Sequence, residues 1–254
     1  MVLLETEGLS INFGGVAALA DVSISVQPGE IHGVIGPNGA GKTSFINAVT
    51  GFVKADQGCI RFDGADVTGL AASSLSAGGL GRTFQHAELF GECTLLENVL
   101  TGFYRHQRYG LLAAVAGFGK AARIERQTRK QAAGLLAQFG LADLAQHRAS
   151  DLPFGLQKRA DMARALAAKP RLLLLDEPVA GMSEGEADET AASIKQLARE
   201  LDITLVVVEH NMRILMSLAT TVTVLAQGRV LARGRPDVIR ANPEVIRTYL
   251  GEDA

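Results

Sequence analysis

"GPNGAGKT" (residues 36–43) matches the pattern G-x-x-x-x-G-K-[ST], and the residues around it decide the fold. An apolar run at 31–36 leads into the pattern, and the segment 44–51 that follows it has helical character. Glycines in such a loop let consecutive backbone N–H groups wrap a polyphosphate at the positive end of a helix. Average residue usage gives the pattern by chance in about one chain in a hundred of this length. We therefore predict a phosphate-binding loop; the alternative is an ordinary glycine-rich turn.

Side chains of this loop add specific chemistry to the backbone cradle. Lys42 would place a positive charge at the β- and γ-phosphates, and the Thr43 hydroxyl is suited to bind Mg²⁺. The sequence thus predicts a site for ATP and Mg²⁺. Its expected nucleotide-binding residues are Gly36, Pro37, Asn38, Gly39, Ala40, Gly41, Lys42, Thr43 and Ser44.

Composition indicates a compact soluble chain with a substantial core, because 47% of its 254 residues are hydrophobic and 20% are charged. A formal net charge of −2 disfavours nucleic acid as a partner. Cys59 and Cys93 lie far apart without metal-like spacing, so we expect a reducing compartment and neither a disulfide nor a zinc site. No export signal opens the sequence, and the apolar segment 111–119 is shorter than the roughly 18 residues that a membrane span needs. We expect a chain that does not cross a membrane.

Hydrophobic patterning predicts an α/β fold. Short apolar runs at 31–36, 172–176 and 204–210 are typical of buried parallel strands. Alternating residues at 21–27 and 59–64, the latter ending in an Asp-Gly turn, indicate half-exposed antiparallel strands. Strand signals become rare between about 84 and 170, which predicts an inserted helical lobe.

Two helices are expected from their end signals. Residues 124–140 close on Gly140, a residue suited to a helix stop, and a short C-terminal helix is expected to start after Pro243.

Asp176 and Glu177 follow the four-leucine strand directly. An aspartate at the carboxyl end of a buried strand can hold the Mg²⁺ shell, and a neighbouring glutamate can orient and deprotonate the attacking water. The Asn-Lys-x-Asp segment of a GTPase is absent from the sequence. Without the phosphate loop, two solvated charges at a strand end would be the simpler interpretation.

These motifs together resemble the ATP-binding subunits of ATP-binding cassette (ABC) transporters, nearly end to end. The resemblance implies a P-loop NTPase with a RecA-like parallel-sheet core, an N-terminal antiparallel β part and the helical lobe. We expect a single ABC ATPase domain, with its core at 1–84 and 167–232, the lobe at 85–166 and a C-terminal tail at 233–254. Phe13 stands where the family stacks a ring on adenine; a core position is the alternative.

Gln85 and His210 match two further family positions. Gln85 in "GRTFQ" corresponds to the glutamine that links Mg²⁺ and the attacking water to the membrane partner. His210 corresponds to the switch histidine that contacts the γ-phosphate, where a donor imidazole would stabilise developing charge. By the resemblance, the catalytic residues are Glu177, His210 and Gln85, and the metal-binding residues are Thr43, Gln85 and Asp176.

The stretch "DLPFGLQKR" (residues 151–159) resembles the family signature Leu-Ser-Gly-Gly-Gln, with Pro153 in place of the serine and Leu156 in place of the glutamine. In ABC proteins, two ATPase subunits close head to tail and the signature of one caps the γ-phosphate bound to the other. Phe154 and Gly155 are therefore expected at the nucleotide, on an exposed helix start that retains its backbone donors and dipole. A degenerate signature is the alternative.

A second departure concerns coupling between the two ATP sites. Ser183 occupies a position where most ABC proteins have an aspartate, although a serine can still hydrogen-bond across an interface. Leu89 and Phe90 are expected either at the permease interface or in the core.

Subfamily features include "GLGRTFQ" (79–85), the proline-aromatic-glycine signature and the tail "NPEVIRTYLGE" (242–252). They resemble the ATPases of branched-chain and hydrophobic amino acid uptake systems. The resemblance implies a second ABC ATPase subunit, identical or different, permease subunits, an indirect solute-binding protein, and a peripheral location on the cytoplasmic face of the inner membrane. Urea, amide or aromatic acid uptake, lipid or lipopolysaccharide export, a non-transport ABC protein and a catalytically silent subunit stay open as alternatives.

Overall fold

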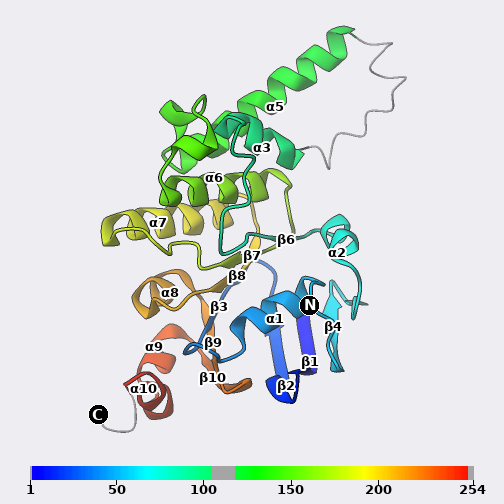
Figure 1. Ribbon diagram of the computed structural model, residues 1–254, viewed down its shortest axis with the longest axis vertical. Coiled ribbons are helices and arrows are strands. Elements are labelled where there is room, and N and C mark those ends of the chain that lie inside the picture. The colour runs from blue at the N-terminus through cyan, green and yellow to red at the C-terminus, as the bar shows by residue number, and fades with distance from the viewer. Residues whose placement is uncertain (1, 104–117, 251–254) are drawn as a thin grey trace. The chain divides into compact units, whose positions relative to one another are not determined.

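The computed structural model describes residues 2–103 and 118–250, and the chain divides into two compact units (Figure 1). Most of the predicted apolar segment 111–119 lies outside the described residues. Within the described part we find no helix whose length and hydropathy would let it cross a bilayer. The first unit comprises Met1–Arg82, Arg171–Glu177 and Ile194–Ala254, and the second comprises Thr83–Pro170 and Pro178–Ser193.

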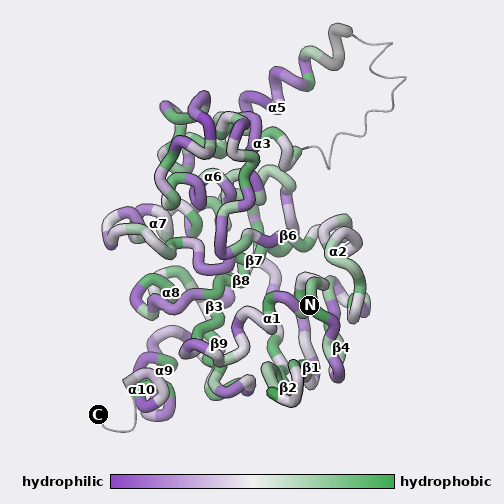
Figure 2. The backbone as a smooth tube through the Cα atoms, viewed as in Figure 1, coloured by the Kyte–Doolittle hydropathy of each residue, from purple (hydrophilic) through white to green (hydrophobic). Residues whose placement is uncertain are grey.

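A six-stranded sheet, in the order β10-β9-β3-β8-β7-β6, forms the centre of the first unit. Its four inner pairings, from β9 to β6, are parallel, and β10 joins β9 antiparallel. The three predicted buried strands are confirmed, because every residue of β3, β7 and β8 is buried, and hydrophobic residues follow these strands in Figure 2. The bounds are β3 Ile31–Ile35, β6 Leu80–Arg82, β7 Leu172–Asp176, β8 Thr204–Val208, β9 Thr221–Ala226 and β10 Arg229–Gly234.

A second, antiparallel sheet in the order β2-β1-β4-β5 confirms the other two predicted strands. The Asp-Gly turn joins β4 to β5 with positive φ angles of 54° at Asp63 and 77° at Gly64, as expected for a tight hairpin. The strands are β1 Leu4–Phe13, β2 Val16–Val26, β4 Gln57–Phe62 and β5 Ala65–Asp66.

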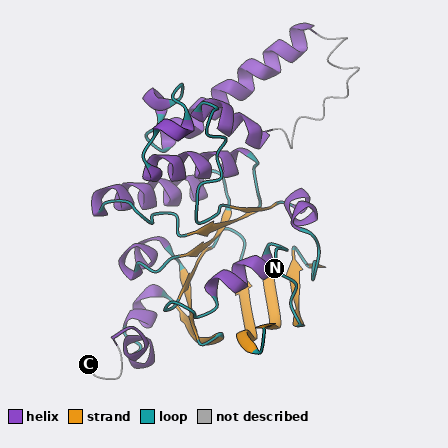
Figure 3. Cartoon of the chain, viewed as in Figure 1, coloured by secondary structure: helices purple, strands orange, loops and turns teal. Residues whose placement is uncertain are grey.

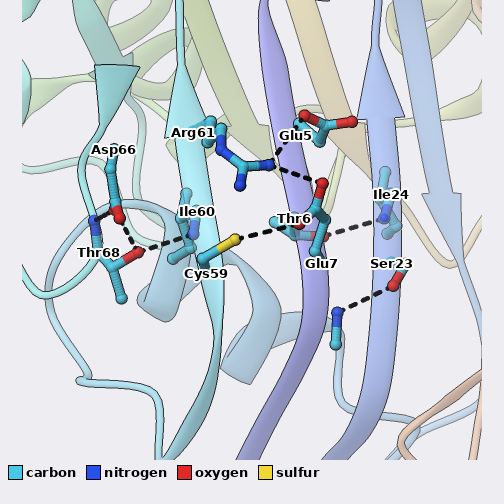
Figure 4. A network of polar contacts seen from close by, with 11 residues as sticks. Glu5, Thr6, Glu7, Ser23, Ile24, Cys59, Ile60, Arg61, Asp66 and Thr68 are labelled. Carbon is cyan, nitrogen blue, oxygen red and sulfur yellow. Dashed lines mark hydrogen bonds and ion pairs between the residues drawn. The ribbon is translucent and has the colours of Figure 1, made fainter. Parts of the chain in front are cut away.

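Polar side chains hold the register of this sheet (Figure 4). The buried Thr6 hydroxyl donates to Val22 O at 3.3 Å and accepts from Ile24 N at 3.0 Å, which ties β1 to β2. Across β1 and β4, Arg61 Nη1 lies 2.6 Å from Glu7 Oε1. Since a shift of one residue would turn every side chain to the other face, these contacts favour one pairing.

Helices complete the first unit. The predicted C-terminal helix is confirmed, and it begins at Pro243 itself; the Asn242 side chain accepts from Glu244 N at 2.8 Å. Asn211 caps α8 by accepting from Ile214 N. The helices are α1 Lys42–Val49, α2 Ala72–Gly78, α8 Met212–Leu218, α9 Pro236–Arg240 and α10 Pro243–Leu250.

In the second unit, helices are joined by loops (Figure 3). The predicted helix at 124–140 is confirmed as part of α5, which ends at Gln138, and Gly140 follows with a φ of 71°. Gly102 lets α3 approach α6, because a Cβ there would lie 2.3 Å from Arg164 O. The helices are α3 Leu95–Phe103, α5 Phe118–Gln138 and α6 Phe154–Ala167, with the 3₁₀ turns η2 Ala142–Leu144 and η3 Ala149–Asp151. The helix α7 (Glu184–Glu200) starts in this unit and ends in the first.

A buried polar chain crosses the start of β3. The fully buried His32 ring places Nδ1 3.0 Å from Glu30 Oε1 and Nε2 2.9 Å from Thr223 Oγ1. Burial alone would raise the pKa of Glu30, but hydrogen bonds from His32, Gln27 N and Thr221 outweigh it and lower the pKa to about 2. The ionised carboxylate is therefore a stabilising part of the folded state.

Glu30→Gln should destabilise the protein at neutral pH by on the order of 3 kcal/mol, and by less than half of that at pH 3. A carboxyl whose pKa is depressed in the folded state stabilises above its ordinary pKa of 4.5 and loses that effect as the pH falls toward 2. Urea unfolding of both proteins at pH 7, 5 and 3 measures the difference. An equal difference at pH 7 and pH 3 would contradict the role of the ionised group.

Candidate active site

The loop 36–41 connects β3 to α1 and has the geometry of a phosphate cradle. Gly41 precedes the helix with a φ of 100°, and a Cβ there would lie 2.5 Å from Ala18 O. At Gly36 a Cβ would lie 2.2 Å from Leu225 O. Glycine is therefore required at both positions, and the loop brings backbone N–H groups to the start of α1, where anions bind favourably.

Lys42 lies in the first turn of α1, with 8% of its surface exposed. Its Nζ donates to Gly36 O at 2.7 Å and to Pro37 O at 2.9 Å, so the ammonium group folds back over the loop. Burial lowers the pKa of Lys42, while the charges of Glu177 and Asp176 oppose that shift. The predicted phosphate-binding lysine and the predicted acidic pair thus share one electrostatic site. Of the predicted hydroxyl residues beside Lys42, Thr43 is exposed and Ser44 is half-buried.

Asp176 is the last residue of β7, and its side chain is 7% exposed. Arg82 Nη2, at the end of β6, lies 3.2 Å from Asp176 Oδ2. Sequence reasoning did not single out Arg82. The available signal was one arginine within the otherwise apolar and small stretch "GLGRTF", where a charge is expected to need a buried partner.

Glu177 has a left-handed backbone, with a φ of 48°, and its N–H donates to Val208 O at 2.9 Å. For a residue with a side chain, such a conformation costs on the order of 1 kcal/mol or more and is often found at functional sites. The turn ends β7 abruptly and leaves the Glu177 side chain 21% exposed. The position suits a group that must reach a substrate.

His210 lies beside Glu177, with its Nδ1 3.7 Å from Glu177 Oε1 and its side chain 58% exposed. The fully buried Glu209 carboxylate accepts from His210 N at 3.2 Å and from Asn211 N at 3.4 Å, which orients the segment after β8. Lys42, Asp176, Glu177 and His210 are therefore brought together in the first unit, as the sequence predicts. Their catalytic roles stay predictions.

Phe13, at the end of β1, is 51% exposed and pairs with Val16 across the turn to β2. The core alternative is thereby wrong for this side chain, since about half of its surface faces solvent. Stacking on adenine stays a prediction, and an exposed aromatic ring is suited to it.

Gln85 belongs to the second unit and is an exposed residue in the segment after β6. Further along this segment, Phe90 is 58% exposed while its backbone is fixed by the buried Asn98 side chain, which donates to Phe90 O at 3.0 Å. Leu89 is half-buried. The core alternative is wrong for Phe90, whereas the roles of Gln85 and of the permease interface stay predictions.

In the signature stretch, α6 begins at Phe154, and Pro153 is the N-cap with a φ of −53°. The predicted helix start is confirmed, with Pro153 just before the first turn. Phe154 is 40% exposed and has Lys158 Nζ 5.2 Å from its ring centre. A Cβ on Gly155 would meet only the flexible Met182 side chain, at 3.3 Å. The chain's own backbone therefore does not require glycine at this position, and the role of Phe154 and Gly155 at a nucleotide stays a prediction.

Ser183 has a partner that the sequence analysis missed. Its hydroxyl and its N–H both donate to Glu186 Oε2, at 2.7 and 2.9 Å, and Glu186 N lies 3.4 Å from Ser183 Oγ. These contacts form a capping box at the start of α7, and the signal was the spacing S-x-x-E at 183–186. The serine therefore has a structural role within the chain.

Comparisons with known proteins agree with this geometry. The sequence family described as "ABC transporter" matches residues 19–180, and "Branched-chain amino acid ATP-binding cassette transporter" matches residues 229–254. Relatives include the high-affinity branched-chain amino acid transport ATP-binding proteins BraF of Pseudomonas aeruginosa, 40% identical, and LivG of Escherichia coli, 38% identical, each aligned over 98% of both chains.

Among solved structures, a nucleotide-free ATP-binding cassette from an ABC transporter is 32% identical, with a TM-score of 0.83 over 99% of this chain and 100% of that one. The ADP conformation of the cassette MJ1267 is 31% identical, with the same TM-score and the same coverage. The sequence match, the parallel sheet and the phosphate loop agree, and the chain belongs to the ABC transporter family as an ATP-binding cassette with the P-loop NTPase fold.

Proposed function

We propose that this chain hydrolyses ATP to power an ABC importer of branched-chain or other hydrophobic amino acids. The observation that carries the proposal is the placement of Glu177 next to His210 and Asp176, in the electrostatic field of the loop lysine Lys42. The names of BraF and LivG, which are similar over almost their whole length, support the class of solute.

In the proposed reaction, the backbone of 36–44 and the Lys42 ammonium hold the phosphates, while Phe13 stacks on adenine. Thr43 and Asp176 would hold Mg²⁺ together with Gln85, and the hydroxyl and carboxylate donors fit the oxygen ligands that this ion prefers. Bound there, Mg²⁺ would neutralise charge on the β- and γ-phosphates.

Glu177 would orient a water molecule and accept its proton as the water attacks the γ-phosphorus. The bond from that phosphorus to the bridging oxygen breaks in the same reaction, and ADP leaves with that oxygen. His210 donates to the oxygens on which negative charge develops.

We further propose that the chain acts as one ATPase domain, paired with a second ABC ATPase subunit on the cytoplasmic face of the membrane. Phe154 and Gly155 would cap the ATP bound to the partner, and the exposed Phe90 would lie in the surface that receives the permease subunits. An exposed aromatic ring on a backbone fixed by a buried amide suits such an interface. A solute-binding protein would act only through the permeases.

The test is reconstitution of the chain in vesicles with the permeases, the second ATPase and the binding protein of a branched-chain amino acid importer. We expect ATP-dependent uptake of labelled leucine, isoleucine and valine, and its loss in Lys42→Ala. Uptake of urea or an aromatic acid in their place would replace the proposed solute class. ATP hydrolysis that drives lipid outward instead would overturn the importer assignment.

A further inference from the structure

Arg82 makes a three-point contact that the nucleotide-binding roles above do not use. Its Nη1 lies 2.6 Å from Asn47 Oδ1 on α1 and 3.1 Å from Oγ1 of Thr50, the C-cap of that helix, and its Nη2 lies 3.2 Å from Asp176 Oδ2 on β7. The guanidinium also lies over the Phe52 ring, 5.4 Å from its centre. One planar group therefore connects the helix that follows the phosphate loop to the carboxylate at the end of the neighbouring strand.

Burial makes this contact unusual for an arginine. The Arg82 side chain is 9% exposed and that of Asp176 is 7% exposed. Desolvation lowers the pKa of Arg82, and the Asp176 charge opposes that shift. A buried charged pair is weak evidence for stability, because desolvation offsets much of the attraction. The geometry of the contact instead fits a role in orienting the carboxylate.

Arg171 offers a comparison within the same unit. It also pairs with an aspartate, Asp63, with Nη2 2.7 Å from Oδ1, and it lies over the Phe62 ring at 6.0 Å. Its side chain, however, is 53% exposed, and it precedes β7 at the end opposite to Asp176. Of these two arginines, Arg82 is the one whose guanidinium contacts a predicted metal ligand.

We propose that Arg82 is a positioning residue for metal binding: its fork fixes the orientation of the Asp176 carboxylate relative to α1, so that Asp176 meets the nucleotide-bound divalent cation in a set geometry. This inference rests on the proposed function, since it assumes that Asp176 binds Mg²⁺. Hydrogen-bonded partners of metal ligands typically change metal affinity 10- to 100-fold when they are removed.

Two effects of Arg82 oppose each other, and they can be separated. The positive charge repels a cation, so its loss alone would tighten metal binding, whereas loss of the fork would free the carboxylate to turn and would weaken binding. Arg82→Met removes both charge and fork. Arg82→Lys keeps the positive charge, but the lysine ammonium lacks the planar set of donors with which the arginine guanidinium contacts Asn47, Thr50 and Asp176.

The experiment is titration of Mn²⁺, detected by electron paramagnetic resonance, in the presence of saturating AMP-PNP. We expect the Mn²⁺ Kd to rise about 10-fold in Arg82→Met and several-fold in Arg82→Lys. AMP-PNP affinity measured in EDTA should stay within about two-fold of wild type, because the phosphate loop is retained. Arg171→Met, the matched control, should leave both affinities unchanged.

Several results would overturn the proposal. Tighter Mn²⁺ binding in Arg82→Met would show that Arg82 affects the metal only by charge repulsion. An unchanged Mn²⁺ Kd in a folded Arg82→Lys would also contradict the proposal. Arg82→Lys tests the proposal by itself if Arg82→Met does not fold. An equal loss of AMP-PNP affinity with and without metal would show that Arg82 supports only the fold of the site. A wild-type protein that binds no Mn²⁺ with AMP-PNP would overturn the proposed function as well, whereas the other outcomes leave it intact.

Discussion

Glu177→Gln should lower ATP turnover at least about 100-fold, the usual range for loss of a general base. Glutamine keeps the size of the side chain and can still receive a hydrogen bond from water, but it cannot accept the proton. The left-handed backbone at Glu177 costs similar energy with either side chain, so we expect the fold to be retained. ATP binding should stay within about two-fold of wild type, because the loop at 36–44 and Lys42 are unchanged.

Phosphate release from the purified chain and from the assembled transporter measures this effect. Glu200→Gln is the matched control, since Glu200 lies at the exposed end of α7 and accepts from Gln196 Nε2 at 2.7 Å, a contact that glutamine can keep. Wild-type turnover in Glu177→Gln would refute the catalytic base. Absence of turnover in the assembled wild type would favour a silent subunit instead.

Gly155→Asp should reduce the ATPase activity of the dimer to below about 1% of wild type. A loss of 100-fold requires only about 3 kcal/mol of repulsion in the transition state, because each factor of ten corresponds to about 1.4 kcal/mol. A carboxylate at this helix start would face the γ-phosphate bound to the partner and would repel it. Aspartate in the first turn of a helix is itself stabilising, by about 0.3–1 kcal/mol, so the loss should not reflect unfolding. The new Cβ would meet only the flexible Met182 side chain.

Two further variants separate charge from bulk and from the missing hydroxyl. Gly155→Asn has the size of aspartate without its charge and should retain more activity. Pro153→Ser restores the usual serine of the signature, and it should leave ATPase activity within a few-fold while adding about 1 kcal/mol of helix stability as an N-cap. Full activity in Gly155→Asp, with thermal melting unchanged, would contradict the capping of a partner's phosphate.

Local sequence patterns predicted the buried strands, the half-exposed strands and two helix ends. The apolar runs that form β3, β7 and β8 are short and lead into polar or glycine-containing segments, which favours buried strands over helices. The alternating residues before Gln27 and after Gln57 fit a half-exposed sheet. Helix ends followed from Gly140 and Pro243, because each acts on the backbone within one turn.

Features that depend on distant partners were not predictable in the same way. The guanidinium of Arg82 meets a carboxylate 94 residues later in the chain, and no local pattern specifies that pairing. The left-handed backbone of Glu177 depends on the hydrogen bond to Val208, in the neighbouring strand. The exposure of Phe13 likewise depends on where β1 ends. Residue types alone predict the end of a strand only to within a few positions.

The capping box at the start of α7 makes the effect of a substitution at position 183 depend on the residue at position 186. An aspartate at position 183, as in most ABC proteins, would replace the 2.7 Å contact from the Ser183 hydroxyl to Glu186 with two carboxylates that face each other. We therefore expect substitutions at Ser183 and Glu186 to have non-additive effects on stability, because the two side chains are direct hydrogen-bond partners at the start of α7.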